Sequence, residues 1–110
     1  MSTTRVIKAN GMQVWPRELE EAIAAYPGVM EVGVRGFKDE AHGEIAVAFV
    51  VMKPGISATE HDIREYCKQH LAYYKVPARV VFRKSLPKSL IGKVLRRMLS
   101  LDEPPAAAGA

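Results

Sequence analysis

The sequence predicts an α+β fold: a small three-stranded sheet with packed helices plus an N-terminal β-hairpin. Two short alternating runs flank Asn10-Gly11, and this dipeptide is a strong hairpin signal because both residues tolerate a positive φ. Further along, two segments have apolar residues at helical spacing, and three others have the alternating or continuous apolar pattern of strands. A length of 110 residues suits one domain with a modest core.

The first helix is predicted to begin at Pro16, because the fixed φ of proline suits the first helical position, and to end at Pro27-Gly28. Its glutamates are expected to complement the helix dipole, and its apolar residues to face the core. These residues are Glu18, Glu20 and Glu21 on the one hand, and Leu19, Ala22, Ile23 and Tyr26 on the other.

The second helix is predicted after Thr59, which forms a capping-box pattern with Asp62. Its apolar stripe comprises Ile63, Tyr66, Cys67, His70 and Leu71. Cys67 and His70 share this stripe with core residues, so burial is expected for both rather than Cys/His chemistry. Only two other histidines and no other cysteine are present, which argues against a structural zinc site.

Three segments are predicted to form the sheet. Val29 to Arg35 alternates and should be half-buried, whereas Glu44 to Met52 is almost continuously apolar and should be the central strand. Between them, a polar loop is expected to leave His42 solvated. Arg79 to Arg83 is the third predicted strand, and the apolar spacing after Lys93 predicts a short terminal helix.

The formal charge of +4 is distributed unevenly along the chain. Residues 1–65 have a balance of −3, whereas residues 66–110 have a balance of +7. A one-sided positive field attracts anionic partners, such as phosphates or an acidic protein surface. Aromatic residues are not interleaved with the cations as a nucleic-acid stacking platform requires, so no nucleic-acid partner is expected.

A cytoplasmic location is expected from three features of the chain. Cys67 has no partner for an intramolecular disulfide, which suits a reducing compartment. No apolar run approaches the roughly 20 residues of a transmembrane segment, and the start of the sequence lacks a signal-peptide pattern.

The segment Leu86 to Arg97 combines four cations with a proline and a glycine. Pro87 should end the preceding strand, and Gly92 allows a tight turn that presents Lys93 as a mobile charge for phosphate or carboxylate. Composition alone favours a simpler interpretation, a solvated basic loop that caps a terminal helix. A Walker A loop is excluded, because valine follows Gly92-Lys93 and the required earlier glycine is missing.

This segment, read as Pro-Lys-Ser-x-x-Gly-Lys-x-x-Arg-Arg, resembles the closing motif of the adenylate-forming superfamily, which includes acyl-CoA synthetases, peptide-synthetase adenylation domains and luciferases. Further signatures of that superfamily match in order and spacing between about Val6 and Leu99. They are Gly11-x-x-x-x-Pro16-x-Glu18-x-Glu20, Gly43-Glu44, and Leu71-Ala72-x-Tyr74-Lys75-x-Pro77.

The resemblance implies the C-terminal lid domain of an ATP-dependent acyl-CoA synthetase, with the fatty-acid branch favoured. Residues 5–100 would form this domain, 1–4 a hinge remnant or the artificial start of a cloned fragment, and 101–110 a flexible tail. The hinge position, usually aspartate or lysine in the family, falls at Thr4. Lys93 would be the adenylation lysine, and Gly11 would border the channel for coenzyme A.

The same resemblance implies partners that this segment lacks. The complete enzyme would use ATP, Mg²⁺, coenzyme A and a carboxylic (fatty) acid, and its large N-terminal adenylate-binding domain would belong to the same polypeptide. This domain alone should bind no cofactor or metal and should be inactive. The alternative is a free-standing basic module that binds phosphorylated ligands or an acidic partner without catalysis.

Overall fold

A five-stranded sheet organises the computed structural model, which describes residues 6–101. The strands β3 (Val29–Asp39) and β4 (Gly43–Met52) form a long antiparallel hairpin. Along its other edge, β4 pairs first with β1 (Ile7–Ala9) and then, in parallel, with β5 (Arg79–Phe82). β1 also pairs with β2 (Met12–Val14). The predicted α+β class, the N-terminal hairpin and the central position of the apolar strand are confirmed.

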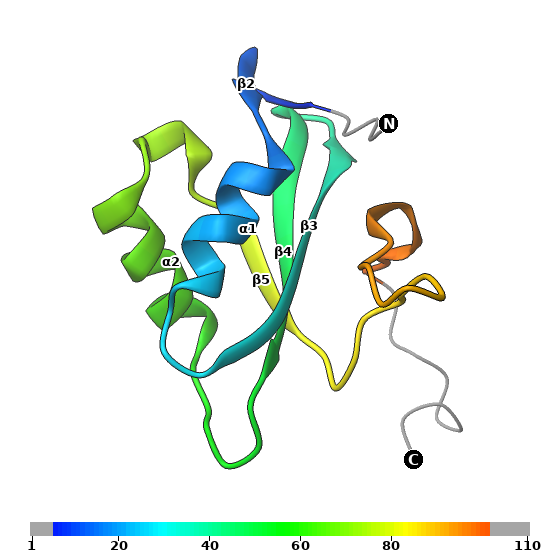
Figure 1. Cartoon of the computed structure of the whole chain (residues 1–110). Coiled ribbons are helices and arrows are strands. Elements are labelled where there is room, and N and C mark those ends of the chain that lie inside the picture. The colour runs from blue at the N-terminus through cyan, green and yellow to red at the C-terminus, as the bar shows by residue number, and fades with distance from the viewer. Residues whose placement is uncertain (1–5, 102–110) are drawn as a thin grey trace.

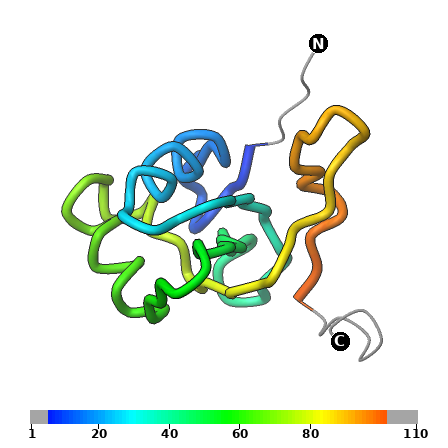
Figure 2. The backbone as a smooth tube through the Cα atoms, turned by 60° about the horizontal axis from the view of Figure 1, so that its bottom comes forward, coloured from blue at the N-terminus to red at the C-terminus, as the bar shows by residue number. Residues whose placement is uncertain are grey.

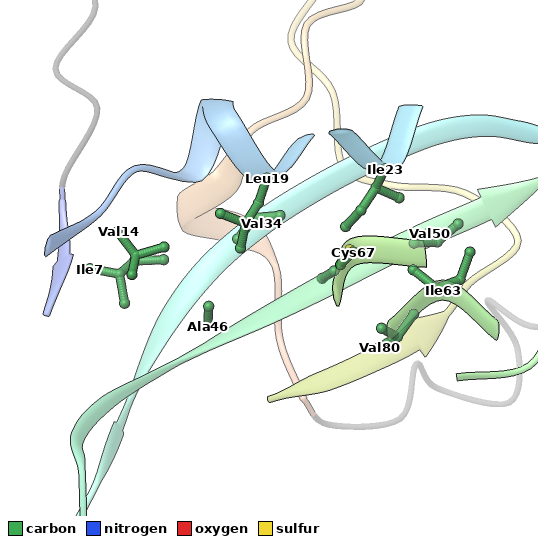
Figure 3. Packing of buried hydrophobic residues seen from close by; sticks show 11 residues of the cluster. Ile7, Val14, Leu19, Ile23, Val34, Ala46, Val50, Ile63, Cys67 and Val80 are labelled. Carbon is green, nitrogen blue, oxygen red and sulfur yellow. The ribbon is translucent and has the colours of Figure 1, made fainter. Parts of the chain in front are cut away.

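Two helices, α1 (Pro16–Ala24) and α2 (Glu60–His70), cover one face of the sheet (Figure 1). The capping box of α2 is present, with Thr59 Oγ1 accepting from the Asp62 amide and Asp62 Oδ2 accepting from the Thr59 amide, each at 3.0 Å. Side chains from both helices and all five strands meet in the first core (Figure 3). Its buried members are Ile7, Val14, Leu19, Ile23, Val34, Ala46, Ala48, Val50, Ile63, Cys67 and Val80.

The chain after β5 crosses to the opposite face of the sheet and covers it (Figures 1 and 2). The second core consists of Val47, Phe49, Val51, Leu86 and Leu99. Gly33 of β3 makes room for this layer, because a Cβ there would lie 2.9 Å from Val94 Cγ1 and 3.1 Å from Leu99 Cδ1. The face of β3 that alternation assigned to solvent is therefore the docking surface for the C-terminal segment.

The predicted terminal helix is wrong. Only a single 3₁₀ turn, η2 (Arg96–Met98), forms there, between the extended residues Leu95 and Leu99. Helix nucleation is unfavourable for so short a segment, and packing on the sheet determines its path instead. A second 3₁₀ turn, η1 (Tyr73–Lys75), precedes β5.

Two smaller expectations are also corrected. The first long strand runs to Asp39 rather than Arg35, since pairing with β4 and contact between the rings of Phe37 and Phe49 extend it. Cys67 is buried as expected, but His70 is exposed in the last turn of α2, where its ring stacks on Tyr66.

Thr4 and residues 102–110 lie outside the described residues. Within residues 6–101, no helix is both long and apolar enough to cross a membrane.

Candidate functional site

Lys93 lies near the tip of a short hairpin formed by residues 88–94, which we call the Lys93 hairpin. A bridge between Lys88 and Val94 closes its base, and the Ser89 amide donates to the Lys93 carbonyl at 2.8 Å. The Gly92 amide donates to the Ser89 carbonyl at 2.9 Å, and Gly92 has a φ of +85°. The predicted glycine turn is confirmed, and it fixes the main chain of Lys93 within the hairpin.

The tip of the Lys93 hairpin projects into solvent. Leu90 and Ile91 have relative exposures of 107% and 87%, and Lys93 is exposed beside them. Among the described residues, the ammonium of Lys93 has no hydrogen-bond or ion-pair partner. A primary ammonium in this position can bind phosphate or carboxylate oxygens of a molecule that approaches the tip.

Other cations of the motif are held by carboxylates of the domain. Lys88 Nζ lies 3.0 Å from Glu31 Oε2. Arg96 binds Glu20 through two contacts, Nε to Oε2 at 2.7 Å and Nη2 to Oε1 at 2.5 Å. The hydrogen bond to Glu20 is the main cause that raises the pKa of Arg96. Lys88 and Arg96 are therefore engaged in ion pairs within the domain, whereas the ammonium of Lys93 remains exposed.

Gly11 occupies the tip of the β1–β2 hairpin, which we call the Gly11 hairpin. Asn10 and Gly11 have φ angles of +53° and +79°, the left-handed pair of a tight hairpin turn. A Cβ at Gly11 would meet no described atom within 4 Å, so the turn needs glycine for its φ and not for space inside the domain. Any steric requirement at this position would come from a molecule or domain outside it.

His42 is exposed, as the sequence predicts, but it has a partner in the same loop. Its Nδ1 lies 2.6 Å from Asp39 Oδ2, and this hydrogen bond is the main cause that lowers the pKa of Asp39. The His42 carbonyl accepts from the amides of Asn10 and Glu44 at 2.9 and 3.0 Å. These contacts join the turn of the β3–β4 hairpin to the Gly11 hairpin, which is a structural role.

A comparison with known protein families identifies the fold that presents these two tips. Residues 18–93 match the AMP-binding enzyme C-terminal domain. The chain belongs to this family.

Related proteins are much longer than this chain. A long-chain-fatty-acid–CoA ligase from Bacillus subtilis is 42% identical over 98 residues, which cover 89% of the chain and 18% of the ligase. A 4-chlorobenzoate–CoA ligase from a Pseudomonas strain is 46% identical over 95 residues, 86% of the chain and 18% of the ligase. An ATP-bound crystal structure of MatB from Rhodopseudomonas palustris has a TM-score of 0.80 at 33% identity, covering 84% of the chain and 18% of MatB.

Several residues of the family signatures make contacts that hold this domain together. Lys75 Nζ binds Glu18 Oε2 at 2.9 Å, and this hydrogen bond is the main cause that raises the pKa of Lys75. The contact ties η1 to the start of α1. Arg64 of α2 donates to the Pro77 carbonyl at 3.0 Å, which fixes the entry into β5.

Three residues that support the Lys93 hairpin were missed as such at the level of sequence. Glu20 was assigned to the helix dipole and to a family signature but to no contact, and Glu31 and Gly33 were included only as part of an alternating strand. No local pattern pairs Glu20 with Arg96, which lies 76 positions away. One signal in the sequence could have indicated such ion pairs. Cations are in excess after residue 65 and carboxylates are in excess before it, so pairs between the two halves are favoured.

Proposed function

We propose that this chain is the mobile C-terminal domain of an ATP-dependent acyl-CoA synthetase acting on fatty acids. Lys93 would act in adenylation, Gly11 would border the passage for coenzyme A, and the hinge to a large N-terminal domain would lie at Thr4. The observation that carries the proposal is the ammonium of Lys93, exposed at a fixed turn and without a partner among residues 6–101.

The chemistry divides into two steps with separate requirements. In the first, a carboxylate oxygen attacks the α-phosphorus of ATP, forming an acyl-adenylate as the bond to pyrophosphate breaks. Positive charge near this centre stabilises the negative charge that develops there, and Lys93 can supply it. In the second step, the thiol of coenzyme A gives up its proton, its sulfur attacks the acyl carbon and AMP leaves. This step needs an open path for the thiol arm.

The Gly11 hairpin suits the second step. Its tip has no side chain, is held by main-chain pairing, and faces open space on its own domain. Figure 1 places this hairpin and the Lys93 hairpin on separate parts of the surface. A rotation about a hinge would therefore present one tip in each half-reaction.

The competing interpretation, a free-standing basic binding module, is disfavoured by ion pairing. Several cations of the basic half are in ion pairs with carboxylates of the domain, namely Lys68, Lys75, Lys88 and Arg96. Their charge is largely neutralised locally, so the balance of +7 does not correspond to one open basic patch.

Similarity of this domain does not by itself select fatty acids, because a 4-chlorobenzoate–CoA ligase is as similar to it as a long-chain-fatty-acid–CoA ligase is, so the acid has to be tested directly. The test compares this chain alone with the complete enzyme, in which the chain is joined to its own large adenylate-binding domain. Alone, it should unfold cooperatively and release no pyrophosphate from ATP and carboxylates. Joined, it should support release with long-chain fatty acids and not with benzoates. Acyl-adenylate formation by the isolated chain, or a preference for benzoates, would contradict the proposal.

A further inference from the structure

The Lys93 hairpin is fastened to the domain by side chains rather than by the sheet. Its bridge at Lys88 and Val94 lies outside the named strands, and its tip residues are exposed. Three contacts hold its base: the Lys88–Glu31 ion pair, Val94 seated over Gly33, and the Arg96–Glu20 ion pair just beyond the hairpin. The two ion pairs flank Lys93 on both sides in the sequence.

Glu20 is itself anchored before it meets the hairpin. Its Oε2 accepts from the main-chain amide of Val34 at 2.8 Å and from Arg96 Nε at 2.7 Å. The side chains of Glu20 and Arg96 are only 15% and 29% exposed. A bidentate pair of this kind fixes orientation as well as distance, because the planar guanidinium matches both carboxylate oxygens.

Glu31 is a poor choice for stability alone. One of its oxygens binds Lys88, but Oε1 is buried without a hydrogen-bond partner among the described residues. A buried acceptor without a partner disfavours folding, and an apolar side chain would avoid this penalty. The arrangement makes sense if the direction of the hairpin matters more than the energy of the contact.

We infer that Glu20 and Glu31 are positioning residues for adenylation, which act through Arg96 and Lys88 to aim the ammonium of Lys93. The inference rests on the proposed role of Lys93, and neither glutamate contacts substrate in it. Reaction rates are sensitive to small displacements of a catalytic group, so loosening either pair should slow adenylation.

The test compares Glu20→Gln with Glu21→Gln in the complete enzyme. Glu21 is the next residue on α1, but it pairs only with exposed Arg17 and does not reach the hairpin among the described residues. Glu20→Gln should lower kcat of adenylation about tenfold. The KM for ATP and the conversion of supplied acyl-adenylate to thioester should change little. Glu21→Gln should leave both half-reactions unchanged.

A second comparison separates positioning from folding. In a Lys93→Ala background, Glu20→Gln should cost adenylation nothing further, because the group that it aims is gone. Lys88→Glu should slow adenylation, and adding Glu31→Lys, which restores the pair with reversed charges, should recover it. Additive losses, equal losses in both half-reactions, or no recovery would overturn the inference. Normal adenylation by Lys93→Ala alone would overturn the proposed function as well.

Discussion

The Gly11 and Lys93 hairpins both turn at a glycine with positive φ, yet they expose different chemical groups at their tips. The Gly11 hairpin offers bare backbone at a tip where a Cβ would meet no described atom within 4 Å. The Lys93 hairpin offers an ammonium that has no partner among residues 6–101, beside two exposed aliphatic side chains. One domain thus carries a turn without a side chain and an exposed ammonium on separate parts of its surface (Figure 1).

The two hairpins also differ in how they are held. The Gly11 hairpin is continuous with the sheet, through β1–β2 pairing, the Ala9–Gly43 pair and the Asn10 amide bonded to His42. The Lys93 hairpin depends on side chains of β3 and α1. Main-chain pairing does not depend on most side chains and so tolerates most substitutions. The side-chain contacts of the Lys93 hairpin can be removed by single substitutions.

The largest expected effect comes from removing the charge of the Lys93 hairpin. Lys93→Ala in the complete enzyme should slow adenylation by on the order of 10²–10³, the usual loss for one donor that stabilises transition-state charge. Conversion of supplied acyl-adenylate and coenzyme A to thioester should stay close to normal. Lys93→Arg should not restore the rate, because a planar guanidinium does not replace a compact ammonium. The two half-reactions are measured separately by pyrophosphate release and thioester formation.

Arg97→Ala is the matched control for this experiment. Arg97 is exposed, lies four positions further on, and contributes its carbonyl rather than its side chain to the contact with Arg35. It should therefore leave adenylation intact. If both variants lose the same activity, the effect belongs to general positive charge; if Lys93→Ala loses none, the segment is the solvated loop that composition alone favours.

The contrast between the hairpins also explains what could be predicted from sequence. Asn10-Gly11, Pro16, the capping box at Thr59 and the apolar run of β4 are local signals, and each element that they predict is present. The terminal helix was wrongly predicted because apolar residues spaced like a helix face can also line an extended segment that packs on a sheet. Val94 and Leu99 do so across Gly33.

The site was predictable only at its tips. Gly92-Lys93 and Asn10-Gly11 predict turns because glycine tolerates a positive φ, and both turns are present in the structure. The Lys93 hairpin and the segment after it are held by contacts between residues far apart in the chain. In one of them, Arg35 donates to the Leu99 carbonyl at 2.6 Å. No periodicity links such residues, because their contact arises from the crossing of the chain to the second face.

A smaller effect is expected from blocking the Gly11 hairpin. Gly11→Leu in the complete enzyme should slow thioester formation from supplied acyl-adenylate by roughly tenfold, because a side chain at the tip would displace the incoming thiol arm. Adenylation should change little. The expected loss of stability is about 1 kcal/mol, the cost of a left-handed φ for leucine.

Gly55→Leu supplies the matched control, since Gly55 has a φ of +80° and open space around its missing Cβ, as Gly11 does. It lies in the loop between β4 and α2, at the opposite end of the molecule from the Gly11 hairpin (Figure 1). Its melting temperature should fall as much as that of Gly11→Leu, without slowing thioester formation. Equal slowing in both variants would assign the effect to backbone strain.

The smallest expected effect concerns Cys67, which lies in the first core, on the opposite face of the sheet from the Lys93 hairpin. Cys67 is the sole cysteine, is fully buried on the core-facing side of α2, and desolvation raises its pKa to about 11. A thiol reagent at pH 8 should therefore label the 110-residue chain only when it unfolds, since the unfolded thiol titrates near 8.5. Lys93→Ala should label as slowly as the unchanged chain, and Gly33→Ala faster, because its Cβ would displace Val94 and Leu99 from the second face.

The pH dependence of this labelling follows from the same shift in pKa. A folded pKa above the unfolded one means that the folded chain holds the proton more tightly, so this contribution to stability is complete below about pH 8.5 and is lost as pH rises towards 11. Labelling should accelerate over that range more than thiolate formation in the unfolded chain explains. Cys67→Ser should remove this contribution from the unfolding free energy over the same range. Fast labelling of Lys93→Ala at pH 8 would mean that the hairpin supports the core, and the loss of adenylation in that variant would then have a structural cause.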